Sequence, residues 1–104
     1  MDDHLVEQTW RNGRVVSGFD PGEWRKDECG AWMNRDQHDA ESEFGWRALK
    51  IRPGPAEDAG SLRPFHWQNS YDIENGRAVC HVKADRADLP AGQAIAQPAN
   101  SGEW

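Results

Sequence analysis

Six tryptophans constrain this chain more than any other feature of its sequence. Only 37% of its 104 residues are hydrophobic. A domain of this size buries only about 60–65% of its unfolded surface, so its core depends on large side chains. Five of the tryptophans lie between residues 10 and 67. We therefore expect several of them to form one core, each with its indole N–H hydrogen-bonded.

The length and the charge fit one small domain with little tendency to bind nucleic acid. The chain has 12 Lys and Arg against 18 Asp and Glu, a formal net charge of −6. Neutralising phosphates drives most non-specific affinity for nucleic acid, and an acidic chain works against it. The balance favours a protein or a small molecule over DNA as the partner. It leaves the oligomeric state open.

The two cysteines, Cys29 and Cys80, belong to no CxxC pair, so a structural zinc site has little support. We expect two reduced thiols, because cytosolic cysteines rarely stay bridged, and the alternative is a disulfide between them. The first ten residues do not have the pattern of a signal peptide. No apolar run reaches the roughly 18 residues of a membrane span. The sequence therefore predicts a cytoplasmic protein without membrane contact.

Turn signals divide the first half of the chain into short elements. Residues 1–8 are polar, and we expect them to fray. Residues 9–19 favour a β-hairpin around Asn12-Gly13, because both positions can adopt positive φ. Strands are expected near Ala31–Met33 and over residues 44–51, with loops over residues 36–43 and 52–61.

The second half is expected to hold one helix, one strand and a tail. The helix is predicted over residues 66–74, with Pro64 before it and Asn75-Gly76 at its end. Residues 77–84 alternate in polarity and predict a strand. Residues 86–104 are rich in Ala, Pro, Gly and Gln and predict a disordered, flexible tail. The expected fold class is α+β, with a single domain over residues 9–85.

Three segments of the chain resemble small bacterial and phage HNH endonuclease domains. They are WRNGRVVSGFDPGEWRKDECGAWM (10–33), SEFGWRALKIRP (42–53) and SLRPFHWQNSYD (61–72). The family typically runs W-x-K-G-x-V-x-G-Y-D, R-K-D-x-x-G-x-W-I, S-E-Y-G-W-E-I-D-H-I-x-P and N-L-R-P-L-x-W-x-N-N. The resemblance covers Trp10 to Asp85, about three quarters of the chain. It implies a ββα-metal fold with an N-terminal hairpin.

The resemblance also implies a metal site whose residues this chain has lost. The family's I-D-H-I supplies a metal-ligating Asp and a His general base, where this chain has Leu49 and Lys50. Leucine offers no oxygen, and a lysine ammonium repels a divalent cation. Ser61 and Ser70 stand at two of the family's Asn positions, and only Asn69 keeps its family identity. We therefore expect neither a bound metal nor another cofactor.

Three functions follow from this loss. The first is a catalytically inactive HNH-like domain that binds a protein partner, including one that regulates or inhibits a nuclease or a defence system. The second is a metal-independent enzyme that uses the former cleft for a small molecule, and the third is a residual metal-dependent nuclease. The candidate catalytic residues of that cleft are Lys50, Ser61, His66, Asn69 and Ser70. Arg47, Arg52 and Arg63 are the candidate binding residues, a local basic strip for a phosphate or a carboxylate.

Overall fold

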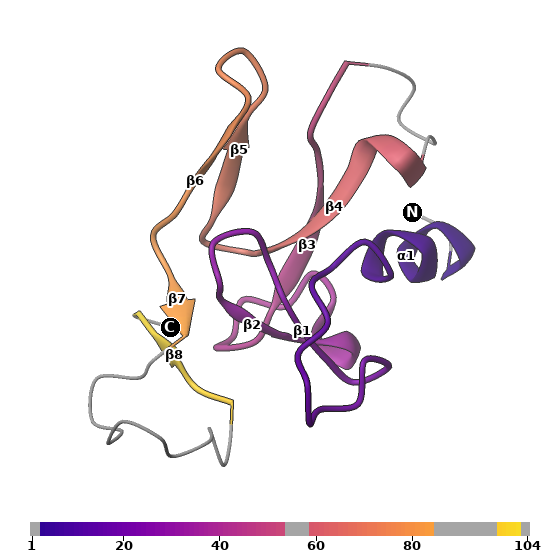
Figure 1. Cartoon of the computed structure of the whole chain (residues 1–104), viewed down its shortest axis with the longest axis vertical. Helices are drawn as coiled ribbons and strands as arrows, with labels where there is room; N and C mark the ends of the chain where they lie inside the picture. Colours follow the sequence, from indigo (N-terminus) through magenta and orange to yellow (C-terminus); the bar gives the residue numbers. More distant parts are fainter. Residues whose placement is uncertain (1–2, 54–58, 85–97, 103–104) are drawn as a thin grey trace.

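The computed structural model describes residues 3–53, 59–84 and 98–102. Within these residues it is a mixed α+β fold, with one α-helix and four antiparallel strand pairs, so the predicted fold class is confirmed. The elements are α1 (Asp3–Trp10), β1 (Trp24–Lys26), β2 (Trp32–Asn34), η1 (Arg35–Gln37), β3 (Trp46–Lys50), η2 (Ala59–Ser61), β4 (Leu62–His66), β5 (Ser70–Asp72), β6 (Arg77–Val79), β7 (Lys83–Ala84) and β8 (Asn100–Ser101). Figure 1 shows the β3–β4 pair in the middle, with α1 on one side and the β5–β6 hairpin extending away from it.

Tryptophan forms much of the core, as the sequence predicts. Trp10, Trp32 and Trp46 are each at most 1% exposed, and the ring centroids of Trp10 and Trp46 are 5.1 Å apart. The Nε1 atom of Trp10 donates to the carbonyl oxygen of Pro21 at 2.8 Å. The Nε1 atoms of Trp32 and Trp46 are buried and have no hydrogen-bond partner among the described residues. The expectation that every buried indole is hydrogen-bonded is therefore wrong for these two.

The β3–β4 pair is the longest in the structure, and its first strand was predicted. Trp46 lies opposite His66 and Lys50 lies opposite Leu62 in an antiparallel register. Gly45 precedes β3, and any Cβ at this position would collide with the backbone oxygen of Ala40. Only glycine therefore allows the chain to approach this closely. The strand predicted near Ala31–Met33 is also confirmed, as β2.

The predicted N-terminal hairpin is wrong. The residues expected to fray, from Asp3 onward, belong to helix α1, which buries Val6, Thr9 and Trp10. Val6 and Trp10 are one helical turn apart, so the helix gains a buried face that the polar composition of residues 1–8 conceals. Asn12 and Gly13 follow this helix, and their N–H groups donate to Thr9 and Trp10 at 3.0 and 2.9 Å. The Asn-Gly pair thus ends a helix.

The predicted helix over residues 66–74 is absent. Strand β4 continues to His66, and β5 pairs with β6 so that Tyr71 lies opposite Ala78. Gly76 adopts a φ of 65° in the turn between them, a conformation that Asn-Gly pairs favour in hairpins. The region predicted as one strand over residues 77–84 is divided between β6 and β7. The helix that would complete a ββα-metal fold is therefore not found among the described residues.

Part of the predicted tail is built into the fold. Residues 86–97, 103 and 104 lie outside the described residues, but Asn100 and Ser101 form β8 and pair with β7. Asn100 is only 5% exposed. Its Oδ1 accepts from the N–H of Trp32 at 2.7 Å, and its Nδ2 donates to the carbonyl oxygen of Trp32 at 2.8 Å. Because one amide side chain satisfies both backbone groups of Trp32, a flexible tail is wrong at this point.

A disulfide joins the loop between β1 and β2 to the segment after β6. It links Cys29 to Cys80 across 51 positions of sequence, with Cα atoms 5.5 Å apart. The expectation of two reduced thiols is therefore wrong, and the alternative pairing holds. No helix in the described part of the chain has the length and apolar character needed to cross a bilayer.

Candidate functional site

The β3–β4 hairpin separates residues that were expected to share one cleft. Lys50 pairs with Leu62 at one end of the hairpin, and His66 pairs with Trp46 at the other. These pairs lie four positions apart, about 13 Å at the rise of roughly 3.3 Å per strand residue. Asn69 follows β4 at the His66 end. The structure therefore does not bring Lys50 together with His66 or Asn69.

Ser61 and Ser70 are likewise divided between the two ends. The N–H of Ile51 donates to the carbonyl oxygen of Ser61 at 2.9 Å, which places Ser61 near Lys50. Ser61 is only 1% exposed, so its hydroxyl is closed to solvent. Ser70 is exposed and begins β5, opposite Val79. Lys50 and Ser61 share one end of the hairpin, and the hydroxyl of Ser61 is inaccessible to a substrate.

The three arginines of the predicted strip each have a partner. Arg47 lies 3.5 Å from Glu41 in an exposed ion pair, and Arg52 donates to the carbonyl oxygen of Gly60 at 2.7 Å. Arg63 forms an ion pair with Glu28. Exposed pairs of this kind stabilise a fold by less than about 1 kcal/mol, so the arginines remain available to compete for a ligand.

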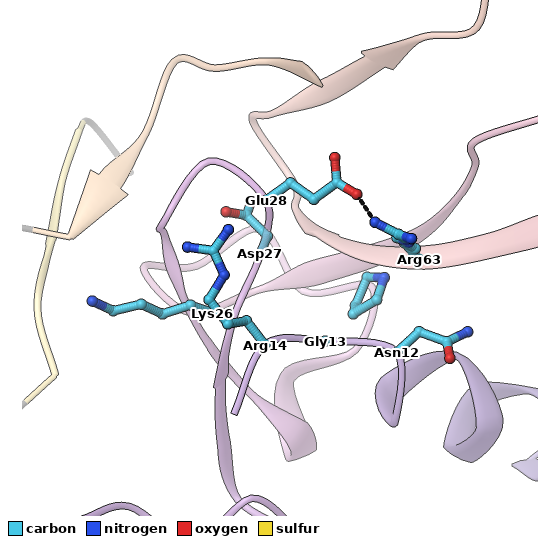
Figure 2. Close-up of a pocket in the computed structure, with 8 residues that line it drawn as sticks. Asn12, Gly13, Arg14, Lys26, Asp27, Glu28 and Arg63 are labelled. Atoms are coloured by element: carbon cyan, nitrogen blue, oxygen red, sulfur yellow. Dashed lines mark hydrogen bonds and ion pairs between the residues drawn. The ribbon is translucent and has the colours of Figure 1, made fainter. Parts of the chain in front are cut away.

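Of these arginines, only Arg63 lines a pocket of about 250 Å³ beside β4. Three segments far apart in the sequence meet around this pocket. It is lined by Asn12, Gly13, Arg14, Lys26, Asp27, Glu28, Arg63 and Pro64. Figure 2 shows Arg14 and Arg63 on different sides of it, with Glu28 reaching Arg63. Sequence analysis did not single out Arg14, and only the convergence of the three segments reveals it.

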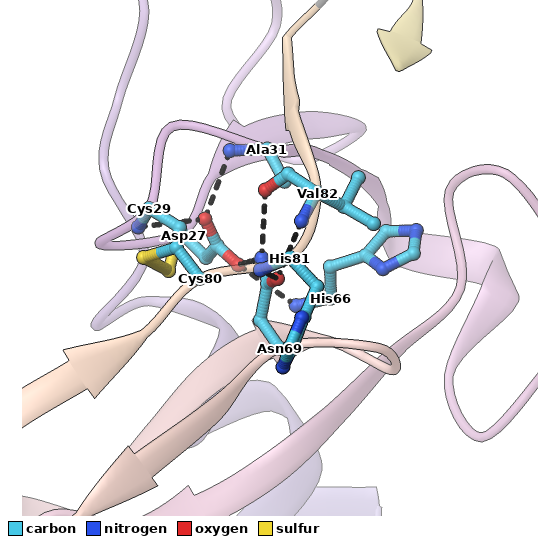
Figure 3. The surroundings of a disulfide bond; sticks show 8 residues. All are labelled: Asp27, Cys29, Ala31, His66, Asn69, Cys80, His81 and Val82. Carbon is cyan, nitrogen blue, oxygen red and sulfur yellow. Dashed lines mark hydrogen bonds between the residues drawn. A yellow bond between two sulfur atoms is a disulfide. The ribbon is translucent and has the colours of Figure 1, made fainter. Parts of the chain in front are cut away.

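Asp27 is the centre of a buried polar cluster that sequence analysis also missed. Its Oδ1 accepts from the N–H groups of Cys29 and Ala31, each at 2.9 Å. Its Oδ2 accepts from the N–H of His66 at 3.0 Å and from Nδ2 of Asn69 at 2.9 Å (Figure 3). Burial raises the pKa of Asp27, and these four donors oppose that shift because they favour the carboxylate. The carboxylate therefore holds three parts of the chain together.

Asn69, which the sequence resemblance places in the family's site, uses its whole amide inside this cluster. Nδ2 donates to Asp27 and to the carbonyl oxygen of Val82, both at 2.9 Å. Oδ1 accepts from the N–H groups of His81 and Val82 at 2.7 and 2.8 Å. Asn69 is only 4% exposed. The side chain therefore fastens the segment after β6 to the turn after β4, and no part of its amide faces a ligand.

His66 is fully buried and has both ring nitrogens engaged. Nδ1 accepts from the N–H of Gln68 at 3.2 Å, and Nε2 lies 2.8 Å from the carbonyl oxygen of Glu43. An Nε2–H donor satisfies both contacts in the neutral imidazole. Burial lowers the pKa of His66, while Asp27 and Glu43 act in the opposite direction. The ring therefore presents no nitrogen to a substrate.

The residues at the family's metal positions do not fit a metal ion. Leu49 has no ligating atom, and Lys50 and Ser70 belong to different ends of the hairpin. Within the described ranges, no three His, Cys, Asp or Glu side chains gather in a group that could hold a metal. We derive no reaction step through such an ion.

Comparison with known proteins yields no relative, because no family model, curated protein or solved structure matches this chain.

Proposed function

We propose that this chain is a non-catalytic domain of HNH-like ancestry that acts by binding a partner protein. The observation that carries this proposal is the role of Asn69. Both atoms of its amide are hydrogen-bonded within the fold, to Asp27, His81 and Val82. The only retained residue of the family's site thus serves structure, and the others are replaced.

The enzyme alternatives have less support from the same geometry. A metal-independent enzyme in the former cleft would need Lys50 and His66 to act on one substrate, yet they lie at opposite ends of the hairpin. A residual nuclease would need oxygen or nitrogen ligands around one point, and the family positions supply a leucine, a lysine and a serine. Neither alternative has an observation that favours it over binding.

The HNH ancestry is itself part of the proposal. The quoted motifs support it, and so does Gly45, whose close approach to Ala40 explains a glycine at this place in the pattern. The β5–β6 hairpin occupies the sequence where the family has its helix. A binding domain tolerates a hairpin in place of this helix, because it needs a stable surface and does not need metal ligands at fixed positions.

The class of partner follows from charge. The net charge of −6 disfavours a polyanion such as DNA. We propose a protein partner, with regulation or inhibition of a nuclease or defence system as the setting. The cytoplasmic location expected from the sequence conflicts with the Cys29–Cys80 bridge, since stable bridges are typical of oxidising compartments. Alkylation of the two thiols in intact cells measures which state is present.

A nicking assay tests the absence of catalysis. The purified chain is incubated with supercoiled plasmid and Mg²⁺, Mn²⁺ or Ni²⁺, beside Lys50→Ala and the matched control Arg52→Ala. We expect no metal-dependent nicking by any of the three proteins. Nicking by the wild type that is lost in Lys50→Ala and kept in Arg52→Ala would contradict the proposal.

A further inference from the structure

We infer that the pocket between Arg14 and Arg63 binds one carboxylate group of a protein partner. This inference rests on the proposed binding function and names the chemistry by which it works. The pocket of about 250 Å³ brings together residues 12–14, 26–28 and 63–64. Its volume suits a side-chain or C-terminal carboxylate with the carbons next to it.

The backbone around the pocket is held in place before any ligand arrives. The N–H of Arg14 donates to the carbonyl oxygen of Lys26 at 2.8 Å, and the N–H of Lys26 donates back to Arg14 at 2.9 Å. Arg25 donates to the carbonyl oxygens of Arg11 and Gly13 at 2.9 and 3.0 Å, which fixes the turn after α1. Binding therefore orders little besides the Arg14 side chain, and this lowers its entropic cost.

Two of the charged residues lining the pocket have their charges engaged elsewhere. The Asp27 carboxylate is surrounded by its four donors in the buried cluster. The Nζ atom of Lys26 lies over the Trp32 ring, 4.7 Å from its centroid. The charges left to the pocket are those of Arg14, Glu28 and Arg63, and their sum is +1.

Arg14 supplies the uncompensated charge. Glu28 neutralises Arg63, whereas the guanidinium of Arg14 has no ion pair or hydrogen bond among the described residues, and the residue is exposed. A guanidinium presents a planar fork of donors that matches a carboxylate in two parallel bonds. The pocket thus contains the Arg14 guanidinium, which has no charged partner among the described residues, beside the Arg63–Glu28 ion pair.

The neighbouring Glu28 favours a single carboxylate over a nucleic acid. A nucleic acid would bring several phosphates against Glu28 and against a chain of net charge −6. One carboxylate brings one negative charge to one unmatched guanidinium. We therefore assign the pocket to an acidic residue or the C-terminus of a partner protein.

NMR titration of the full ¹⁵N-labelled chain tests this assignment. Sodium acetate is the probe, sodium chloride at equal ionic strength is the blank, and a short single-stranded DNA is a competing probe. We expect saturable shifts of the Gly13 and Glu28 amides with acetate. Arg14→Gln should weaken this binding by about tenfold or more, the usual effect of losing a charge-assisted hydrogen bond. The control Arg47→Gln removes another exposed arginine and should leave it unchanged.

A second variant tests the same charges, with tighter acetate binding as the expected result. Glu28→Gln frees Arg63 and removes the competing carboxylate, so we expect acetate to bind several-fold more tightly. Unsaturable shifts that Arg14→Gln does not alter would overturn the assignment, and so would DNA binding at the pocket more tightly than acetate. Such a failure is distinct from failure of the proposed function, because metal-dependent nicking would contradict the latter and leave the acetate result standing.

Discussion

The two ends of the β3–β4 hairpin differ in how they use polar side chains. At the His66 end, Asp27 and Asn69 form a closed network of hydrogen bonds, and the Cys29–Cys80 bridge lies beside it. At the Lys50 end, the nearest candidate hydroxyl, Ser61, is buried. The difference shows that the polar side chains at the His66 end contribute to the stability of the fold.

The low apolar content of the chain gives a physical reason for the hydrogen-bond network and the disulfide at the His66 end. With 37% hydrophobic residues, burial alone gives a small domain little stability. A covalent bridge and a fully satisfied polar network are two ways to supplement such a core. The free energy of unfolding should therefore depend strongly on side chains at the His66 end and hardly on Lys50 at the other end.

Asn69→Ala should cause the largest change. It removes one of the two donors to Asp27 Oδ2 and leaves the carbonyl oxygen of Val82 and two N–H groups without partners, so we expect a loss of about 3–5 kcal/mol in the free energy of unfolding. Urea denaturation measures it. The control Ser70→Ala alters the adjacent exposed residue and should cost less than about 0.5 kcal/mol. Equal costs for the two variants would contradict the claim that the hydrogen bonds of Asn69 stabilise the His66 end.

Opening the disulfide should have the second largest effect. The bridge spans 51 positions, and closing a loop of that length stabilises a fold by about 2–4 kcal/mol. We expect the Cys29→Ser/Cys80→Ser double variant to unfold at correspondingly lower urea concentration, and reductant to have no further effect on it. A wild type whose unfolding midpoint is insensitive to reductant would contradict this prediction.

Acidification should weaken the His66 end. Burial holds the pKa of His66 below its ordinary value of 6.5, so below about that pH the unfolded chain binds a proton that the folded chain does not. Stability therefore falls as the pH drops, by up to about 1.4 kcal/mol per pH unit for this group. His66→Gln should reduce the slope of unfolding free energy against pH. Identical slopes in wild type and His66→Gln would show that this histidine does not titrate on unfolding.

The smallest effect is expected at the Lys50 end. Lys50 is half-buried and lies outside the polar network around Asp27, so Lys50→Ala should change the free energy of unfolding by less than about 1 kcal/mol. Urea denaturation alongside Asn69→Ala gives the comparison directly. A cost as large as that of Asn69→Ala would mean that both ends of the hairpin carry structural networks.

Strands β2, β3 and β6 and the tryptophan core could be predicted, but each of the two Asn-Gly pairs has the role expected of the other. Asn12-Gly13 ends a helix and Asn75-Gly76 turns a hairpin, although a turn signal alone fits both. The difference lies in what flanks them. The helix before Asn12 is held by burial of Val6 and Trp10, whereas Tyr71 pairs across a strand with Ala78. Local propensity does not contain this tertiary information.

The site was less predictable, for a related reason. The differences from the metal motif of the resembling family are visible in the sequence, because they depend on residue identity alone. The Asp27 cluster and the Arg14 pocket depend on which distant segments meet. Nothing in the sequence around Asp27 marks it as the centre of a polar cluster. Only the fold brings His66 and Asn69 into contact with its carboxylate. Such contacts follow from the fold and not from spacing.

Thermal unfolding with and without Mn²⁺ tests the central claim most directly, that the hairpin keeps no metal site. An ion that binds only the folded chain raises its stability by about 2.7 kcal/mol at a concentration about 100 times its Kd. The account predicts the same unfolding temperature in Mn²⁺ as in an equal ionic strength of sodium chloride. A rise in Mn²⁺ that disappears in Ser70→Ala would contradict it.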